Sequence, residues 1–219
     1  MKYLHENKIL ITGPTGTGTT FLLGLFHELG YNTGYEDSYV HKILNGRGKG
    51  LEYTRTKSTR DPWLKARNED TDISPHVIKQ PIQDYGDDGG TGVICNAVNT
   101  AEENNWRISH IFVTVRNLTA IVDSVKRRMN TGEPVMFKIK GDEAKRQREL
   151  LAAEGVYRLL CDLAIRNYAF TLIEFPKSVD DVKYCFDKLT PVLLPSKHTY
   201  TIFEETHTRI ANKNMVHVR

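Results

Sequence analysis

A glycine-rich turn between an apolar run and an amphipathic segment constrains the fold of this chain more than any other feature. The stretch ILITGPTGTGTTFL, residues 9–22, joins a run typical of a buried strand to a segment with helical periodicity. Gly13 and Gly18 keep the spacing of the phosphate-binding pattern G-x-x-x-x-G-K-[ST], and Thr20 keeps its final hydroxyl. Thr19 stands where that pattern has lysine. The turn therefore predicts an anion site without its usual cation.

Such a turn holds an anion through backbone groups. N–H groups at the start of a helix point toward the ligand, and the helix dipole adds to the attraction. Glycines let the backbone approach the ligand closely, and the hydroxyls of Thr17, Thr19 and Thr20 are expected to donate to it. The residues predicted to form this cradle are Gly13, Thr15, Gly16, Thr17, Gly18, Thr19 and Thr20.

Short β-rich runs alternate with helical patterns along the chain, which indicates a parallel sheet covered on both faces. Strands are predicted at KILIT, HVIKQ, HIFVTV and FTLIEF, with a weaker one at YNTGY. Helices are predicted over 19–30, after the N-cap residue Asn117, over 142–167 and at SVDDVKYCFDKL, with Ser178 or Asp180 near the cap. We expect an α/β, three-layer P-loop-type fold, whose central, mostly parallel sheet has about five strands and helices on both faces.

The length of 219 residues predicts one domain spanning residues 1–219. Residues 45–74 are polar, charged and poor in periodic apolar positions, so we expect a mobile insertion there. A net charge of +3 with no dense basic block excludes a typical nucleic-acid binder but suits a small anionic ligand. No apolar run is long enough to span a bilayer, and three scattered cysteines fit a reducing compartment, so the expectation is a cytoplasmic protein with no membrane partner.

A second motif follows the strand predicted at HIFVTV. Arg116 stands at the end of that strand, and Ser124 follows eight residues later beside the apolar stripe of the next helix. A guanidinium and a hydroxyl in these places can converge on one phosphate above the carboxyl edge of the sheet. An arginine paired with a nearby carboxylate and a serine bonded to its own helix would give the same spacing.

Together the two motifs resemble those of the sulfotransferase family, which uses 3′-phosphoadenosine 5′-phosphosulfate as donor. The family's loop reads K/R-S-G-T-T, and GTGTT at residues 16–20 matches its last four positions with threonine in place of serine. The resemblance implies that the loop holds the donor's 5′-phosphosulfate and that Arg116 and Ser124 hold its 3′-phosphate. It also implies sulfuryl transfer to a hydroxyl or amine of an unidentified acceptor, with no metal ion.

The chain departs from this family at one position that matters. The loop lysine or arginine of the family falls on Gly16, so another cation must take its place. Lys79, at the end of HVIKQ, is the first choice, and Arg47 and Lys49 in the NGRGKG segment are alternatives. The resemblance further implies a general base, for which we favour Glu36, with three alternatives: Asp37, His76 and Asp84.

Two other function classes stay open at this point. A nucleoside or nucleotide kinase with a degenerate Walker A loop would need a metal-binding carboxylate, but HIFVTV is followed by Arg116 instead. Glu174 is the only carboxylate inside a predicted strand. A non-catalytic nucleotide-binding relative is the other class, because Gly16 removes the family's loop cation.

Overall fold

The computed structural model describes residues 7–14, 16–35, 37, 40, 76–79, 107–123, 143–194 and 197–211. The insertion predicted at 45–74 lies outside these residues. No helix in the described part of the chain combines the length and the apolar character needed to cross a membrane.

The sheet has four parallel strands in the order β2-β1-β3-β4. Their bounds are β1 (Asn7–Thr12), β2 (Val77–Lys79), β3 (Arg107–Val115) and β4 (Phe170–Glu174). Each contains or lies within a predicted strand, so the α/β assignment and the parallel sheet are confirmed. Residues 31–35 form no strand, and a fifth strand is not among the described residues. Tyr31 packs in the apolar core instead. The strand was predicted because an aromatic run with buried positions has the composition of a strand.

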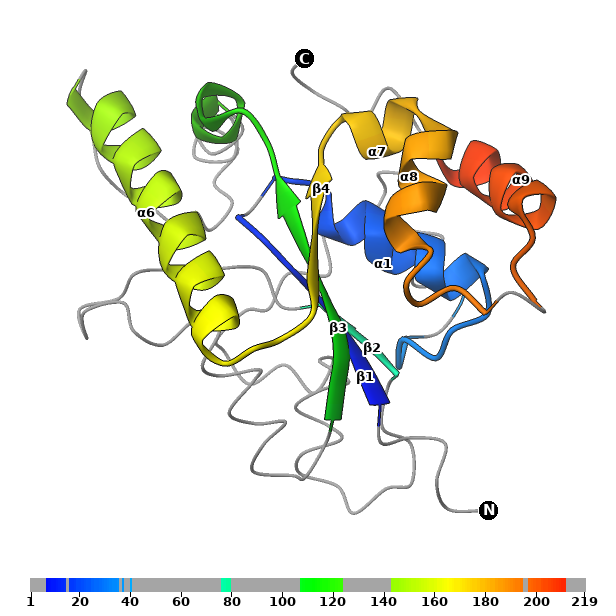
Figure 1. Cartoon of the computed structure of the whole chain (residues 1–219). Coiled ribbons are helices and arrows are strands. Elements are labelled where there is room, and N and C mark those ends of the chain that lie inside the picture. The colour runs from blue at the N-terminus through cyan, green and yellow to red at the C-terminus, as the bar shows by residue number, and fades with distance from the viewer. Residues whose placement is uncertain are drawn as a thin grey trace.

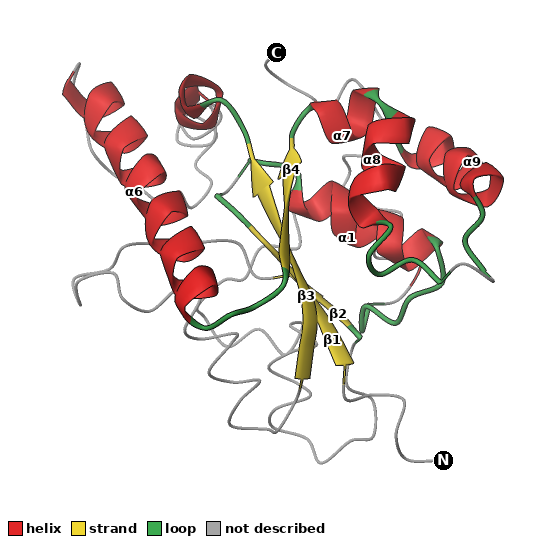
Figure 2. Ribbon diagram, viewed as in Figure 1, coloured by secondary structure: helices red, strands yellow, loops and turns green. Residues whose placement is uncertain are grey.

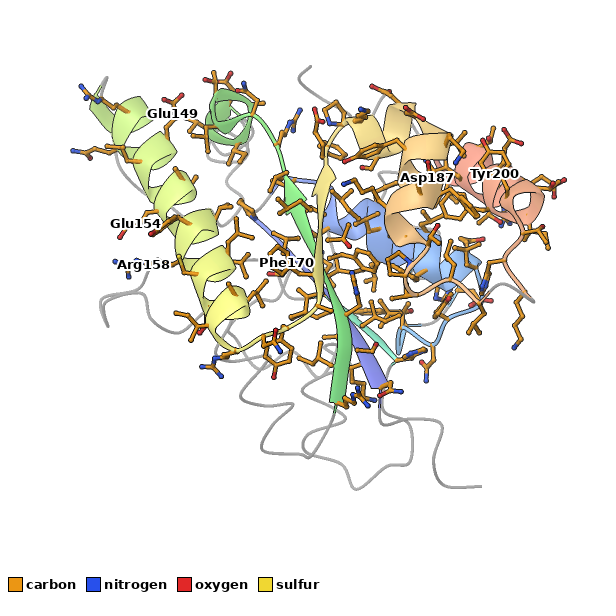
Figure 3. The ribbon with its side chains drawn as sticks, in the orientation of Figure 1. Glu149, Glu154, Arg158, Phe170, Asp187 and Tyr200 are labelled. Atoms are coloured by element: carbon orange, nitrogen blue, oxygen red, sulfur yellow. The ribbon has the colours of Figure 1, made fainter. Side chains whose placement is uncertain are left out.

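Helices cover both faces of this sheet (Figure 1). The helices are α1 (Thr19–Glu28), α6 (Glu143–Ile165), α7 (Lys177–Asp180), α8 (Val182–Leu189) and α9 (Tyr200–Ile210). α6 lies on the left of the sheet in Figure 2, and the other four lie on the right. Residues 118–123 form a further helical stretch after β3. Thr119 in this stretch donates a hydrogen bond at 3.0 Å to Glu149 of α6, which is labelled in Figure 3.

The two faces of the sheet bury separate apolar clusters, because side chains alternate along each strand. Ile9 and Ile11 of β1 pack with α1, α8 and α9, whereas Leu10 packs with α6. The first cluster includes Leu22, Leu23, Leu25, Phe26, Phe112, Ile173, Cys185, Leu189 and Phe203. The second includes Ile78, Ile111, Val113, Leu159 and Leu163. The central strands therefore hold the glycine turn on a rigid base.

Two of the predicted helix boundaries are confirmed by their caps. Gly30, at φ 83°, ends α1 as a left-handed C-terminal residue. The Asn117 side chain accepts hydrogen bonds from the backbone N–H groups of Thr119 and Ala120 at 3.0 and 3.4 Å. These caps fix where α1 ends and where the helical stretch after β3 begins.

The predicted helix at SVDDVKYCFDKL is divided in the structure. Asp181 adopts an extended conformation between α7 and α8, and its carboxylate accepts from the N–H of Tyr184 at 2.9 Å. Asp181 is therefore the N-cap of α8, in place of the predicted Ser178 or Asp180. Ser178 is buried within α7. α9 had no counterpart among the predicted helices.

The outer edge of the sheet is partly covered at β4. The N–H of Glu174 on that edge donates to the hydroxyl of Tyr184 at 2.8 Å. Lys177 lies over the same Tyr184 ring, 4.6 Å from its centroid. A side-chain hydroxyl thus satisfies a backbone donor that an edge strand would otherwise present to other chains.

Lys8 is fully buried near the amino end of β1, on the face that Leu10 shares. Burial lowers the pKa of Lys8 from 10.5 to about 8. Between these two pH values Lys8 is protonated in the unfolded chain but neutral in the folded protein. Its contribution therefore makes the free energy of unfolding rise with pH. Below about pH 8 both states are charged and the full penalty of burial remains.

The variant Lys8→Met should therefore lose this pH dependence. We expect the difference in unfolding free energy, wild type minus variant, to be flat below about pH 8 and to rise by up to about 1.4 kcal/mol per pH unit above it. Urea unfolding of both proteins at pH 7, 8.5 and 10 measures this difference, and other groups cancel in the subtraction. Parallel pH profiles would contradict the expectation.

Candidate anion-binding site

The glycine turn lies at the carboxyl edge of the sheet, between the end of β1 and the start of α1. Gly13, Gly16 and Gly18 all have positive φ, at 141°, 84° and 88°. A Cβ on Gly13 would come within 2.4 Å of the carbonyl oxygen of Thr114 on β3. A Cβ on Gly18 would lie 2.3 Å from the ring of Phe175, which follows β4. Close packing against Thr114 of β3 and against Phe175 after β4, as well as the backbone angle, requires glycine here.

The three described threonines of the turn, Thr17, Thr19 and Thr20, have different environments. Thr17 is completely buried, and its hydroxyl lies 2.5 Å from the Pro14 carbonyl and 2.6 Å from the Thr114 hydroxyl. Thr17 therefore ties the turn together and does not present a hydroxyl to a ligand, contrary to the prediction. Thr19 is also buried, at 5% exposure. Only the Thr20 hydroxyl has a partner that brings positive charge to the turn.

That partner is Lys79, the last residue of β2. Its ammonium group donates a hydrogen bond to the Thr20 hydroxyl at 2.9 Å. Ile11 of β1 pairs with Lys79, so the ladder register sets the height of this side chain at the sheet edge. The side chain is partly buried, which strengthens its attraction for an anion. The structure thus brings the lysine chosen from the sequence to the turn that lacks one.

Arg116 approaches the turn from the other side. It follows β3, and its guanidinium donates to the carbonyl oxygen of Gly16 at 3.1 Å. The same guanidinium lies over the ring of Phe175, 5.0 Å from the ring centroid. The aromatic face and the Gly16 carbonyl hold the cation against the turn.

The strand order explains why both cations meet the same turn. β1 lies between β2 and β3, so the turn after β1 is flanked by Lys79 on one side and Arg116 on the other. At the start of α1, Gly18 provides no side-chain cap, and the first turn carries no acidic residue. The start of α1 and two cations therefore lie at the same turn, which favours a ligand with more than one negative charge.

Comparison with protein-family models and with curated proteins yields no match. What the site can do therefore follows from its own residues. Its donors are backbone N–H groups, an ammonium group and a guanidinium, which together bind phosphate or sulfate oxygens well.

Two of the alternatives for the general base lie away from the turn. His76 precedes β2, and its backbone bonds to Ile9 and to Asn32, at the amino edge of the sheet. Asp37 contacts His27, in the last turn of α1, at 3.0 Å. Both are at the end of the layer opposite to the turn, so neither can accept a proton from an acceptor bound there.

Several predicted residues lie outside the described part of the chain. They are Thr15 of the cradle, Ser124 of the second motif, Glu36 and Asp84 among the bases, and Arg47 and Lys49 among the cations. The roles given to them remain predictions.

Two residues of the site were not found from the sequence. Thr114 contacts both Gly13 and Thr17, and Phe175 contacts Gly18 and Arg116. The signal for Thr114 was a hydroxyl residue near the end of the apolar run of β3, two positions before Arg116. Phe175 directly follows a predicted strand, but its contact with Gly18 depends on the strand order.

Proposed function

We propose that this protein is sulfotransferase-like: it holds the 5′-phosphosulfate of 3′-phosphoadenosine 5′-phosphosulfate and transfers the sulfuryl group to a hydroxyl or amine of an acceptor. The observation that carries the proposal is the contact between the Lys79 ammonium and the Thr20 hydroxyl at 2.9 Å. Lys79 restores to the turn the positive charge that Gly16 and Thr19 do not provide.

The same contact bears on the choice between sulfuryl and phosphoryl transfer. In nucleotide-hydrolysing P-loops the hydroxyl at the Thr20 position binds Mg²⁺, and an acid at a strand end helps to hold the ion. Here the hydroxyl bonds to an ammonium group, and Arg116 follows β3. Glu174 is exposed on the edge strand β4, two strands away from β1. This arrangement favours a protein that binds its ligand without a metal ion over a kinase, which needs one.

In the proposed reaction an acceptor oxygen or nitrogen attacks the sulfur in line with the bond to the 5′-phosphate. That S–O bond breaks, the acceptor loses its proton to a base, and 3′,5′-bisphosphoadenosine leaves. Lys79 and the loop N–H groups would stabilise charge on the leaving phosphate and on the transferring sulfuryl oxygens.

Calorimetry with three ligands tests the binding step. Wild-type protein should bind 3′,5′-bisphosphoadenosine in the presence of a metal chelator, and more tightly than it binds ATP. Preference for Mg-ATP, with binding lost on chelation, would overturn the proposal in favour of a kinase. A transfer assay with labelled donor and pooled hydroxyl and amine acceptors then tests the chemical step.

A non-catalytic nucleotide-binding protein is the second candidate. The observation that favours it is the place of His76 and Asp37 at the far edge of the layer. It predicts tight binding of 3′,5′-bisphosphoadenosine together with no labelled product from any acceptor in the pool.

The variant Arg116→Ala tests the role given to this residue in ligand choice. Arg116 is proposed to contact the 3′-phosphate, so its loss should weaken binding of 3′,5′-bisphosphoadenosine by roughly tenfold more than binding of 5′-AMP. Loosening of the turn through the lost Gly16 bond would weaken both ligands equally. Comparing the two affinities separates these effects.

Arg158→Ala provides the control for this measurement. Arg158 lies on α6 and is paired with Glu154 (Figure 3). Its replacement by alanine removes the same charge as Arg116→Ala does. It should leave both affinities unchanged. An unaltered ratio of the two affinities in Arg116→Ala would show that Arg116 does not read the 3′-phosphate.

A further inference from the structure

The hydroxyl of Thr114 is buried where β3 meets the glycine turn. Thr114 has 1% exposure, and its hydroxyl contacts the Thr17 hydroxyl at 2.6 Å and the Thr12 carbonyl at 3.1 Å. Gly13 packs directly on the same residue. Thr114 therefore contacts the turn on both sides of Pro14, at Gly13 before it and at Thr17 after it.

The three hydrogen bonds around this pair cannot all form at once. Thr17 and Thr114 each carry one hydroxyl proton, and the contact between them uses one of the two. If Thr114 donates to Thr17, then Thr17 donates to Pro14. If Thr17 donates to Thr114, then Thr114 donates to Thr12. A third arrangement, in which each hydroxyl donates to its carbonyl, is disfavoured because it leaves the two hydroxyl oxygens 2.6 Å apart with no proton between them. The Thr17–Thr114 bond is present in both favoured arrangements, so it is the main link between the turn and β3.

This link holds the part of the turn that has the greatest backbone freedom. Thr17 stands between Gly16 and Gly18, which both have positive φ. Glycines on both sides give the unanchored backbone many other conformations, and a ligand would have to remove that freedom on binding. An anchor that is formed before the ligand arrives reduces this loss.

We propose that Thr114 is a positioning residue, whose hydroxyl holds the turn in the shape that presents its N–H groups to the anion. The inference rests on the proposed function for the identity of the ligand. It adds a residue that contacts no ligand and acts through Thr17.

The test compares Thr114→Val with Thr114→Ser, using calorimetry with 3′,5′-bisphosphoadenosine. Valine keeps the shape but removes the hydroxyl, so we expect roughly tenfold weaker binding, whereas serine keeps the hydroxyl and should restore the affinity. Thr17→Val removes the same bond from the other side and should match Thr114→Val. It also replaces Thr114→Val if that variant does not fold.

Thr206→Val is the matched control. Thr206 is also a buried threonine, but its hydroxyl bonds to Ile202 within α9. Its loss should leave the affinity unchanged. Wild-type affinity in Thr114→Val, or equal weakening in Thr114→Ser, would overturn the positioning role.

Hydrogen exchange of the turn amides separates this inference from the proposed function. Without any ligand, exchange at residues 16–19 should accelerate in Thr114→Val and not in Thr114→Ser. If wild-type protein binds neither 3′,5′-bisphosphoadenosine nor ATP, the proposed function fails, and selective acceleration would still support the anchor. Equal exchange in both variants would overturn the anchor whatever the protein binds.

Discussion

Gly13→Ala is expected to abolish anion binding and to destabilise the protein by roughly 4 kcal/mol. The new Cβ would meet the backbone carbonyl of Thr114 at 2.4 Å and its hydroxyl at 2.3 Å. A β-strand carbonyl in the centre of the sheet cannot move without breaking the ladder. The φ of 141° adds backbone strain to the overlap. Urea unfolding and calorimetry with 3′,5′-bisphosphoadenosine measure the two effects.

Gly30→Ala is the control that isolates the overlap. Gly30 also has a positive φ, at 83°, but nothing lies within 4 Å of its Cβ position. It ends α1 at the opposite end from the turn. Only the backbone strain of about 1–2 kcal/mol is expected there, with ligand affinity unchanged. Equal destabilisation in the two variants would show that the contact with Thr114 is unimportant.

Lys79→Met is expected to weaken binding of 3′,5′-bisphosphoadenosine by about 10- to 100-fold. The Lys79 ammonium group, which is bonded to Thr20, is a cation from outside the loop that lies at the start of α1. Its removal takes away a charge-assisted bond to the ligand and the charge that balances its phosphate. Lys79→Arg keeps the charge in another shape and should fall between wild type and Lys79→Met.

Lys188→Met controls for the change in net charge. Lys188 is near the end of α8 and lies over the ring of Tyr184. It should bind the ligand as wild type does at low and moderate salt. Wild-type affinity in Lys79→Met would remove the main support for the proposed function.

The fold was predictable where local pattern and tertiary structure agree. The strands around KILIT and HIFVTV are apolar runs buried on both faces, and a parallel central strand requires that composition. α1 follows from the apolar periodicity of 19–28 and from the glycines at its two ends. In each case the local sequence and the sheet require the same residues.

The site was predictable only in part, because its contacts depend on strand order. Lys79 and Arg116 were found because Lys79 ends one parallel strand and Arg116 directly follows another, and all such ends share one edge. Thr17 was assigned to the ligand because a hydroxyl in a glycine turn usually faces an anion. Its actual partner, Thr114, is 97 residues later in the chain, and no local pattern indicates that pairing.

Two local errors, at the start of α8 and at residues 31–35, have different causes. Asp180 and Asp181 are both good N-caps, and the sequence alone does not say which one begins a helix. The segment 31–35 has the aromatic composition of a strand, but the ring of Tyr31 packs on Phe26 and His198. At 31–35, tertiary packing overrode the strand propensity of the segment.

The position of β1 between β2 and β3 has a consequence for how the protein reaches its working state. The turn receives its cations from partners 59 and 100 residues further along the chain. During synthesis, the segment that ends at α1 would already contain the whole glycine motif but neither charge. Retention of a dianion would therefore begin only after long-range strand docking, and a bound nucleotide would favour chains that have completed it.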